Sequence, residues 1–309
     1  MAEALLAELA KRLYRLAASP GTHESPLPGV HYARYDVTAG RAKRQWRACL
    51  AIVAQGTKEV VLGRTTYRCA EGHYTAAPLH LPVISRIAVA TPRTPFLALL
   101  VDLNPLTLTE VASQLDDAYR GAPSASVRAL FRGRASDSML EAAVRLTRLL
   151  DSRDAVRVLG PLVVKELVYH LLQGSEGQAI GQFARSGTTT QKVARAAFEI
   201  RSNLQADLDV VALAKAAAMS RSAFFQHFKD VTSLSPIQYQ KRLRLLEAQQ
   251  LIVHAEQTAQ AAAYRVGYQS ASQFSREYTR MFGDAPSRHA AKLRGKHTRR
   301  IHTARHQWG

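Results

Sequence analysis

Two short stretches in the last third of the chain carry hydrogen-bonding and cationic side chains at helical intervals. Several of these side chains point away from the predicted core: Arg221, Ser222, Phe225, Gln226 and Lys229 in the first stretch, and Ser272, Gln273, Arg276 and Arg280 in the second. Hydroxyl, amide and guanidinium groups on one exposed helix face can hydrogen-bond to base edges in the major groove of DNA. The two stretches therefore indicate a nucleic-acid surface.

The elements that position these side chains are predicted from the residues around them. A short apolar helix over 210–217 is followed by a break, and the Ser220 hydroxyl can cap the next helix by accepting a backbone N–H. Phe224 and Phe228 stand four residues apart and face inward on this second helix. Small alanines let the two helices approach closely, as a helix-turn-helix requires.

The same arrangement recurs about 49 residues later. Gly267 provides a turn where positive φ is expected, Ser270 can cap the following helix, and Phe274 and Tyr278 repeat the inward spacing. An amphipathic helix over 236–252, with a proline in its first turn, joins the two copies. Two copies joined by a helix are a far more specific signal than one alanine-rich helix pair.

The charge of the chain supports a polyanionic partner. Of a formal net charge of +18, the last 119 residues carry +11 and the first 190 carry +7. An apolar share of 47% excludes wholesale disorder, and only two cysteines, Cys49 and Cys69, exclude a disulfide scaffold. No signal peptide or membrane-spanning run is expected. The basic tail over 293–309 is expected to be solvated or to add phosphate contacts.

The first half reads differently from the second. Short β-rich runs separated by turn residues are predicted as strands: His31–Val37, Trp46–Ala54, Lys58–Leu62, Thr65–Cys69, Val83–Ala90 and Phe96–Leu103. Amphipathic helices are predicted over Glu3–Ala18, Leu106–Tyr119, Ser138–Leu150 and Ala155–Leu172. This spacing favours a compact antiparallel barrel or sandwich. The helices are expected to form a core layer, a dimerisation face or both.

At these residues the chain resembles the AraC/XylS family of bacterial transcription regulators. The C-terminal resemblance covers roughly 193–292 and rests on Leu213-Ala214, Met219-Ser220, Phe224, His227-Phe228-Lys229, Ser235-Pro236, Gln238-Tyr239, Arg244-Leu245, Ala248, Ala262, Val266-Gly267-Tyr268, Ser270, Phe274-Ser275-Arg276, Phe282-Gly283 and Pro286. The N-terminal part resembles the cupin-like sensor half of one subfamily through Val53-Ala54-Gln55-Gly56, Lys58, Val61-Leu62-Gly63, Tyr67, Leu81-Pro82-Val83 and Pro95-Phe96-Leu97-Ala98-Leu99. Ser233 stands where the family usually has glycine.

The resemblance implies an α+β chain in three parts. A cupin-like β-barrel with flanking helices is expected over 1–185, an all-α domain of two helix-turn-helix units joined by a linker helix over 190–292, and the basic tail over 293–309. The base-reading candidates are Ser222, Phe225, Gln226, Ser272, Gln273 and Arg276. The phosphate-contacting candidates are Arg221, Lys229, Lys241, Arg242, Arg280 and Arg288.

The sensor half offers weaker signals. Trp46, Tyr67, Tyr74 and His80 are the candidates to line an effector pocket. His31, His73 and His80 form no close pair of the His-x-His kind, so neither a metal site nor a cofactor is expected. Cys49 and Cys69 are expected to be small buried residues, since no neighbouring pattern lowers a thiol pKa.

These features predict a cytoplasmic, sequence-specific DNA-binding transcription regulator that responds to a small-molecule effector. Its expected partners are double-stranded promoter DNA, RNA polymerase, the effector and a second copy in a homodimer, and no membrane. One alternative is a cupin-type metal-dependent enzyme with an accessory DNA-binding domain, although no metal triad or nucleophile-and-base constellation is visible. The other is a non-specific nucleoid binder, which would show equal affinity for every duplex.

Overall fold

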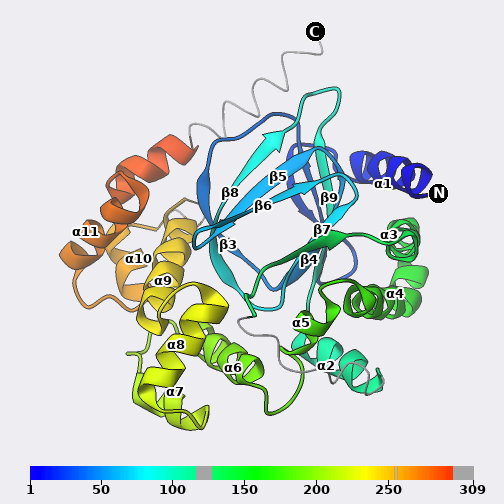
Figure 1. The fold of residues 1–309 in the computed structure, drawn as a ribbon. Helices are drawn as coiled ribbons and strands as arrows, with labels where there is room; N and C mark the ends of the chain where they lie inside the picture. The colour runs from blue at the N-terminus through cyan, green and yellow to red at the C-terminus, as the bar shows by residue number, and fades with distance from the viewer. Residues whose placement is uncertain (116–126, 254, 256, 295–309) are drawn as a thin grey trace. The chain divides into compact units, whose positions relative to one another are not determined.

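The computed structural model describes residues 1–115, 127–253, 255 and 257–294. Its strands are β1 (Gly21–Glu24), β2 (Val30–Tyr35), β3 (Ala42–Trp46), β4 (Cys49–Gln55), β5 (Thr57–Leu62), β6 (Thr65–Ala70), β7 (His73–Ala77), β8 (Leu81–Val89), β9 (Phe96–Asp102) and β10 (Phe131–Arg134). Its helices are α1 (Ala2–Leu16), α2 (Pro105–Gln114), α3 (Asp137–Leu149), α4 (Arg153–Gln173), α5 (Gly177–Gly181), α6 (Thr189–Ser202), α7 (Val210–Ala216), α8 (Arg221–Thr232), α9 (Pro236–Val253), α10 (Ala259–Arg265) and α11 (Ala271–Phe282). Strands therefore fill the first part of the chain and helices the last (Figure 1).

The strands form two antiparallel sheets. The larger sheet has the order β1-β2-β9-β4-β7-β10, and the smaller has the order β3-β8-β5-β6. One apolar cluster draws Val53 and Phe96 from the larger sheet and Cys69 and Ile87 from the smaller, so the two sheets face each other across a shared core. This confirms the α+β class and the strand-rich N-terminal part.

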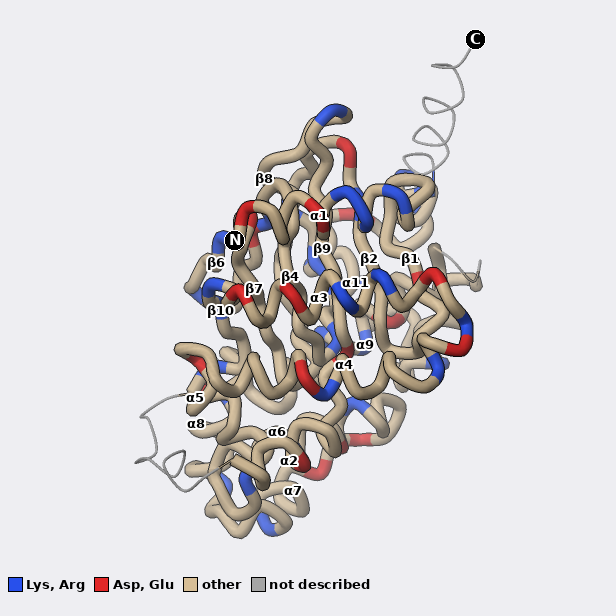
Figure 2. Tube along the Cα trace, turned by 90° about the vertical axis from the view of Figure 1, so that its right-hand side faces the viewer, with Lys and Arg blue, Asp and Glu red and all other residues tan. Residues whose placement is uncertain are grey.

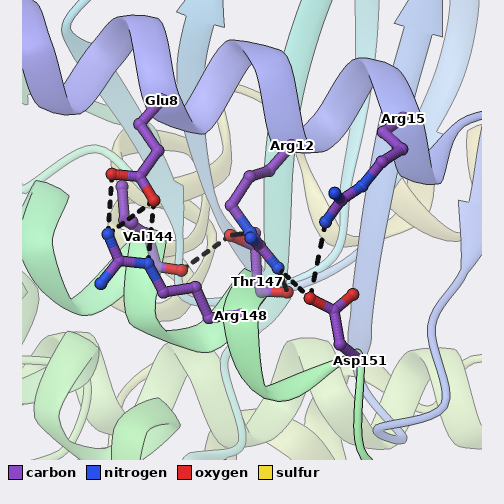
Figure 3. Close-up of polar contacts among 7 residues, drawn as sticks. All are labelled: Glu8, Arg12, Arg15, Val144, Thr147, Arg148 and Asp151. Carbon is purple, nitrogen blue, oxygen red and sulfur yellow. Dashed lines mark hydrogen bonds and ion pairs between the residues drawn. The ribbon is translucent and has the colours of Figure 1, made fainter.

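Helix α1 covers the outer face of the larger sheet and is tied to α3 by polar contacts (Figure 3). Arg12 donates to the hydroxyl and the carbonyl of Thr147, and it pairs with Asp151. Arg148 of α3 makes a second contact with α1 by donating to both carboxylate oxygens of Glu8. The charged face of this amphipathic helix therefore has a structural use, while Leu9 and Leu13 fill the space beneath it.

Several predicted elements have different limits in the structure. The single strand predicted over 46–54 is wrong, because Arg47 and Ala48 separate β3 in the smaller sheet from β4 in the larger. Strands β1, β7 and β10 were not predicted, and neither were residues 42–45 of β3. The helix predicted to run to Tyr119 is α2 as far as Gln114, and Tyr119 lies outside the described residues. Most of the predicted tail over 293–309 also lies outside them.

The contacts group the chain into two compact units. One contains residues 1–198 and 214–235, and the other contains 199–213 and 236–309. Within the first unit, the backbone N–H of Ala129 donates to the carbonyl of Val231 at the end of α8, which joins that helix to the β-rich region. The predicted domain limits at residues 185, 190 and 292 stay predictions. Within the described residues, no helix is both long and apolar enough to cross a membrane.

Candidate nucleic-acid interface and effector cavity

Helix α8 presents the first set of predicted DNA-contacting side chains. The Ser220 hydroxyl accepts from the backbone N–H of Ala223, which is the predicted cap. Phe224 and Phe228 are fully buried and pack against each other in a tilted arrangement with ring centroids 5.7 Å apart, which confirms them as core residues. Since one side of the helix is anchored in this way, the opposite side is left for solvent. Phe225 is partly buried. The other four predicted residues are exposed there: Arg221, Ser222, Gln226 and Lys229.

Helix α11 repeats this construction inside the second unit. The Ser270 hydroxyl accepts from the backbone N–H of Gln273, and Phe274 and Tyr278 are both 0% exposed. These aromatic rings pack in a cluster with Ala262, Ala263 and Val266 of the preceding helix and turn, the small residues that permit close approach. The exposed face carries four of the predicted residues: Ser272, Gln273, Arg276 and Arg280.

The turn before α11 is locked by a buried arginine. Arg244 donates to the backbone carbonyls of Leu204, Ala206 and Gly267, and it is only 9% exposed. Gly267 adopts φ +92°, as expected, and a Cβ at this position would lie 2.5 Å from the carbonyl oxygen of Gln205. Arg244 therefore organises the backbone through hydrogen bonds, and Gly267 allows the chain to approach.

Both predicted base-reading glutamines are hydrogen-bonded to acidic residues that were not predicted from the sequence. In α8, the Gln226 amide donates to Asp230 at 2.9 Å, and in α11 the Gln273 amide donates to Glu277 at 3.2 Å. Each acid follows its glutamine by four residues, so the i,i+4 spacing was the signal that pointed to these pairs. The amides are thereby oriented by carboxylates of their own helices.

Glu277 also gathers partners from α9 and from the turn before α11. Lys241 lies 2.7 Å from it, and the Tyr268 hydroxyl donates to its other oxygen at 2.9 Å. Burial opposes ionisation of this carboxyl, but the hydrogen bonds from Lys241, Gln273 and Tyr268 outweigh burial and hold its pKa below the usual range. Lys241, a predicted phosphate contact, is exposed but already engaged in an ion pair. Arg242 and Arg288 are exposed as well.

The N-terminal unit contains a cavity of about 800 Å³ beside β6 and β10. Of the four predicted effector residues, Tyr67 lines it. Trp46 instead lies under the ammonium of Lys58, 4.8 Å from its ring centroid. Tyr74 is 1% exposed, lies against Gly133 and Gly174, and is not among the lining residues. His80 is partly buried in the segment before β8 and is not among the lining residues. The structure does not gather the four into one pocket.

Titratable groups lie around the apolar core between the sheets. Burial raises the pKa of Cys49 to about 12 and that of Cys69 to about 11, so both thiols stay protonated near neutral pH, as buried cysteines should. Burial also lowers the pKa of Lys58 to about 8. Among the described residues, no group of three or more His, Cys, Asp or Glu side chains is placed to hold a metal ion.

Comparison with known proteins agrees with this architecture. The model of the AraC-type transcriptional regulator N-terminus matches residues 26–179, and a helix-turn-helix domain model matches residues 213–292. The chain belongs to the AraC-type transcriptional regulators. The N-terminal match covers β2 to β10 and the helices from α2 to the middle of α5, and the second match runs from the end of α7 through α11.

Individual relatives are similar over shorter stretches. The HTH-type transcriptional regulator ArgR of Pseudomonas aeruginosa is 28% identical over 155 residues, which are 50% of this chain and 47% of that protein. The probable transcriptional regulator LumQ of Photobacterium leiognathi is 33% identical over 95 residues, 31% of this chain and 38% of that protein. The chain therefore spans less than half the length of these curated relatives.

A solved structure shares the fold over most of the chain. The unsaturated fatty acid-bound ToxT from Vibrio cholerae superposes with a TM-score of 0.57 at 13% identity, covering 85% of this chain and 93% of that one. At this level of identity the likeness shows the arrangement of the elements only.

Proposed function

We propose that this regulator binds specific DNA sequences through α8 and α11 and that an effector bound in its N-terminal unit controls this binding. One observation supports the DNA-binding part above all. Each helix begins at a serine cap and is anchored by two buried aromatic rings. The residues two and six positions after each cap are exposed: Ser222 and Gln226 in α8, and Ser272 and Arg276 in α11. These are side chains that discriminate base pairs in the major groove.

The cations around these helices supply the sequence-independent part of the affinity. Arg221 and Lys229 on α8, and Arg280 and Arg288 in and after α11, are exposed and are proposed to contact phosphates. Lys241 contributes less than these residues, because its ammonium is paired with Glu277. Specificity therefore rests on few residues while affinity is spread over many.

The effector part is supported by the family to which the chain belongs and by the cavity beside β6. The ToxT structure with a bound unsaturated fatty acid is an example of a protein of this fold that holds a ligand. A homodimer and a contact with RNA polymerase are further proposals. For the dimer, exposed apolar side chains on α4 offer support: Val158, Leu159 and Leu162.

Genome-wide footprinting of the full-length protein followed by competition gel shifts tests the proposal. A duplex taken from a footprint should bind at least about 10³-fold more tightly than a shuffled duplex of the same length and salt. Equal affinity for both duplexes would instead identify a non-specific nucleoid binder. Stoichiometric iron or zinc in the purified protein would favour the enzyme alternative.

A further inference from the structure

The cavity of about 800 Å³ in the N-terminal unit is bordered by three arginines. Arg68 comes from β6, Arg132 from β10 and Arg128 from the segment just before β10, while Glu176 is the one carboxylate among the described lining residues. The volume is within the range of roughly 300–1,000 Å³ that small-molecule sites occupy. Figure 2 shows basic positions in both β6 and β10. Two edge strands of different sheets thus bring positive charge to one opening.

Nearby groups of the described chain leave this charge largely uncompensated. Arg128 donates to the neutral hydroxyl of Thr65, and neither Arg68 nor Arg132 makes a hydrogen bond or ion pair with another described residue. Glu59, the register partner of Arg68 on β5, interacts electrostatically with Arg68, but its carboxylate accepts a hydrogen bond from Arg86 at 2.7 Å. Three arginines therefore border the cavity, with Glu176 as the one carboxylate among the described lining residues.

The chemistry of guanidinium narrows the choice of ligand. Its planar fork binds carboxylates and phosphates through two parallel hydrogen bonds, so three such forks can hold more than one oxyanion. The large apolar residues of the lining present little surface to the cavity, because Leu130 and Phe131 are only 2% and 5% exposed. The opening thus offers charge and hydrogen bonds but little apolar surface for a long hydrocarbon chain.

We propose that this cavity binds a small dianionic metabolite, with Arg68 and Arg132 donating hydrogen bonds to its acidic groups and Arg128 bordering the cavity beside Thr65. The inference rests on the proposed effector-responsive function and specifies the class of effector. A dicarboxylate and a phosphate monoester share this chemistry. A long-chain fatty acid does not, since it carries one charge and needs an apolar channel.

Isothermal titration calorimetry on the full-length protein tests the inference. The probes are glutarate as the dicarboxylate, glycerol 3-phosphate as the phosphate monoester, glutaramide as the neutral analogue of glutarate, and oleate. At least one dianion should bind with a Kd below about 1 mM, glutaramide and oleate should not, and the stronger dianion identifies the source of the charge. Failure of both dianions, or oleate binding in their place, would overturn the inference.

Matched arginine variants locate the site. Arg68→Gln and Arg132→Gln should each weaken dianion binding by at least about tenfold, because each removes a charged fork. Arg93→Gln changes the net charge equally at an exposed position in the β8–β9 turn and should bind like the wild type. If the Arg93 variant weakened binding as much as the others, general electrostatics would explain the affinity and the cavity would be the wrong site.

The same samples separate this inference from the proposed function. Both cavity variants should still recognise a footprinted duplex over a shuffled one in the absence of ligand, because the substituted side chains lie outside α8 and α11. Loss of dianion binding with retained DNA recognition supports the cavity assignment. A wild-type protein that binds DNA specifically but no dianion would refute the cavity assignment alone.

Discussion

In the first helix-turn-helix unit the backbone enters the left-handed region at Ala218 and Ser233, and in the second it does so at Gly267 and Gly283. Ala218 and Gly267 are both the second residue after a short helix, and Ser233 and Gly283 both end the helix that follows. The turn itself is one residue longer in the second unit, running over 266–270 rather than 217–220. The first unit thus reaches the left-handed conformation at two non-glycine residues, and the second unit reaches it at two glycines.

Tertiary contacts explain why glycine is required in one unit only. Gly267 approaches the backbone of Gln205 so closely that no Cβ fits, and its carbonyl accepts from Arg244. Ala218 is exposed, so its methyl group meets only the intrinsic cost of a left-handed conformation, of order 1–2 kcal/mol. Gly267 therefore reports close packing as well as the turn.

The exposed faces differ as well. Six residues after the cap, the first unit has Gln226, whose amide is engaged by Asp230, and the second has Arg276, which makes no hydrogen bond or ion pair with another described residue. An arginine with a free fork can bind guanine at once, whereas Gln226 exchanges an existing hydrogen bond for a base contact. The second unit should therefore contribute more to specificity.

Gly267→Ala should have the largest effect on this comparison. The clash with Gln205 and the strained φ together should lower the free energy of unfolding by about 2–4 kcal/mol, measured by urea denaturation of the full-length protein. Gly283→Ala is the matched control, because its φ is +83° but its Cβ would meet no atom within 4 Å. It should cost only about 1 kcal/mol. Equal losses would show that the close approach to Gln205 is unimportant.

Arg276→Ala should weaken binding to a footprinted duplex by about 1–3 kcal/mol and relax one base position, as measured by competition gel shifts against a library of single-base variants. Gln226→Ala should lose less, since its partner Asp230 already satisfies the amide. Arg280 lies four residues further along the same helix and is proposed to contact phosphate. Arg280→Ala should weaken cognate and shuffled duplexes alike. The base-reading assignment fails if Arg276→Ala does the same.

Glu277→Gln should lower the stability of the second unit by about 1–2 kcal/mol at pH 7 through loss of its charged hydrogen bonds. The pKa of Glu277 is lower in the folded than in the unfolded protein, so this stabilisation is present above the unfolded value and disappears as the pH falls through the folded one. Urea denaturation at pH 7 and in the acid range should show the two proteins converging in acid.

Asp230→Asn provides the counterpart in the first unit. Its one described hydrogen-bond partner is an exposed amide, and the carboxylate lies near the C-terminus of α8, where a negative charge is unfavourable. The change in stability should be about 0.5 kcal/mol or less. A loss as large as that of Glu277→Gln would mean that the two acids have the same structural role.

Ala218→Gly should have the smallest effect and the opposite sign. Relief of the left-handed strain should stabilise the protein by about 0.5–1 kcal/mol. Ala216→Gly, two residues earlier and exposed at the end of α7, should destabilise it by up to about 1 kcal/mol, because glycine weakens a helix. Melting temperatures of both variants against the wild type test this reversal. Destabilisation by both would place Ala218 outside the left-handed region in solution.

Much of the DNA-binding region was predictable because its signals are local. A serine cap, two aromatic residues four apart and a turn residue all act within one or two helical turns, so their spacing alone predicted α8 and α11 and their exposed faces. The four aromatic core residues followed from the same periodicity and are fully buried. The i,i+4 acids Asp230 and Glu277 were equally local but were not recognised.

The β-rich unit depended on contacts between distant residues. The run over 46–54 is continuously strand-like, yet Trp46 pairs with Leu81 in one sheet and Cys49 with Ala77 in the other. Alternation within a strand cannot specify which sheet it joins. Likewise, Arg68 and Arg132 lie 64 positions apart in unremarkable segments, and only the approach of β6 and β10 brings them to one cavity.

The sequence by itself thus determined the family, the two helices that are proposed to contact DNA and the concentration of positive charge in the last 119 residues. The tertiary structure decided which cations are free, which glycine is irreplaceable and where a cavity forms. The physical reason is the distance along the chain over which each interaction acts. Caps and helical periodicity act between neighbours in the chain, whereas ion pairs, close backbone approaches and cavities arise between residues that only folding brings together.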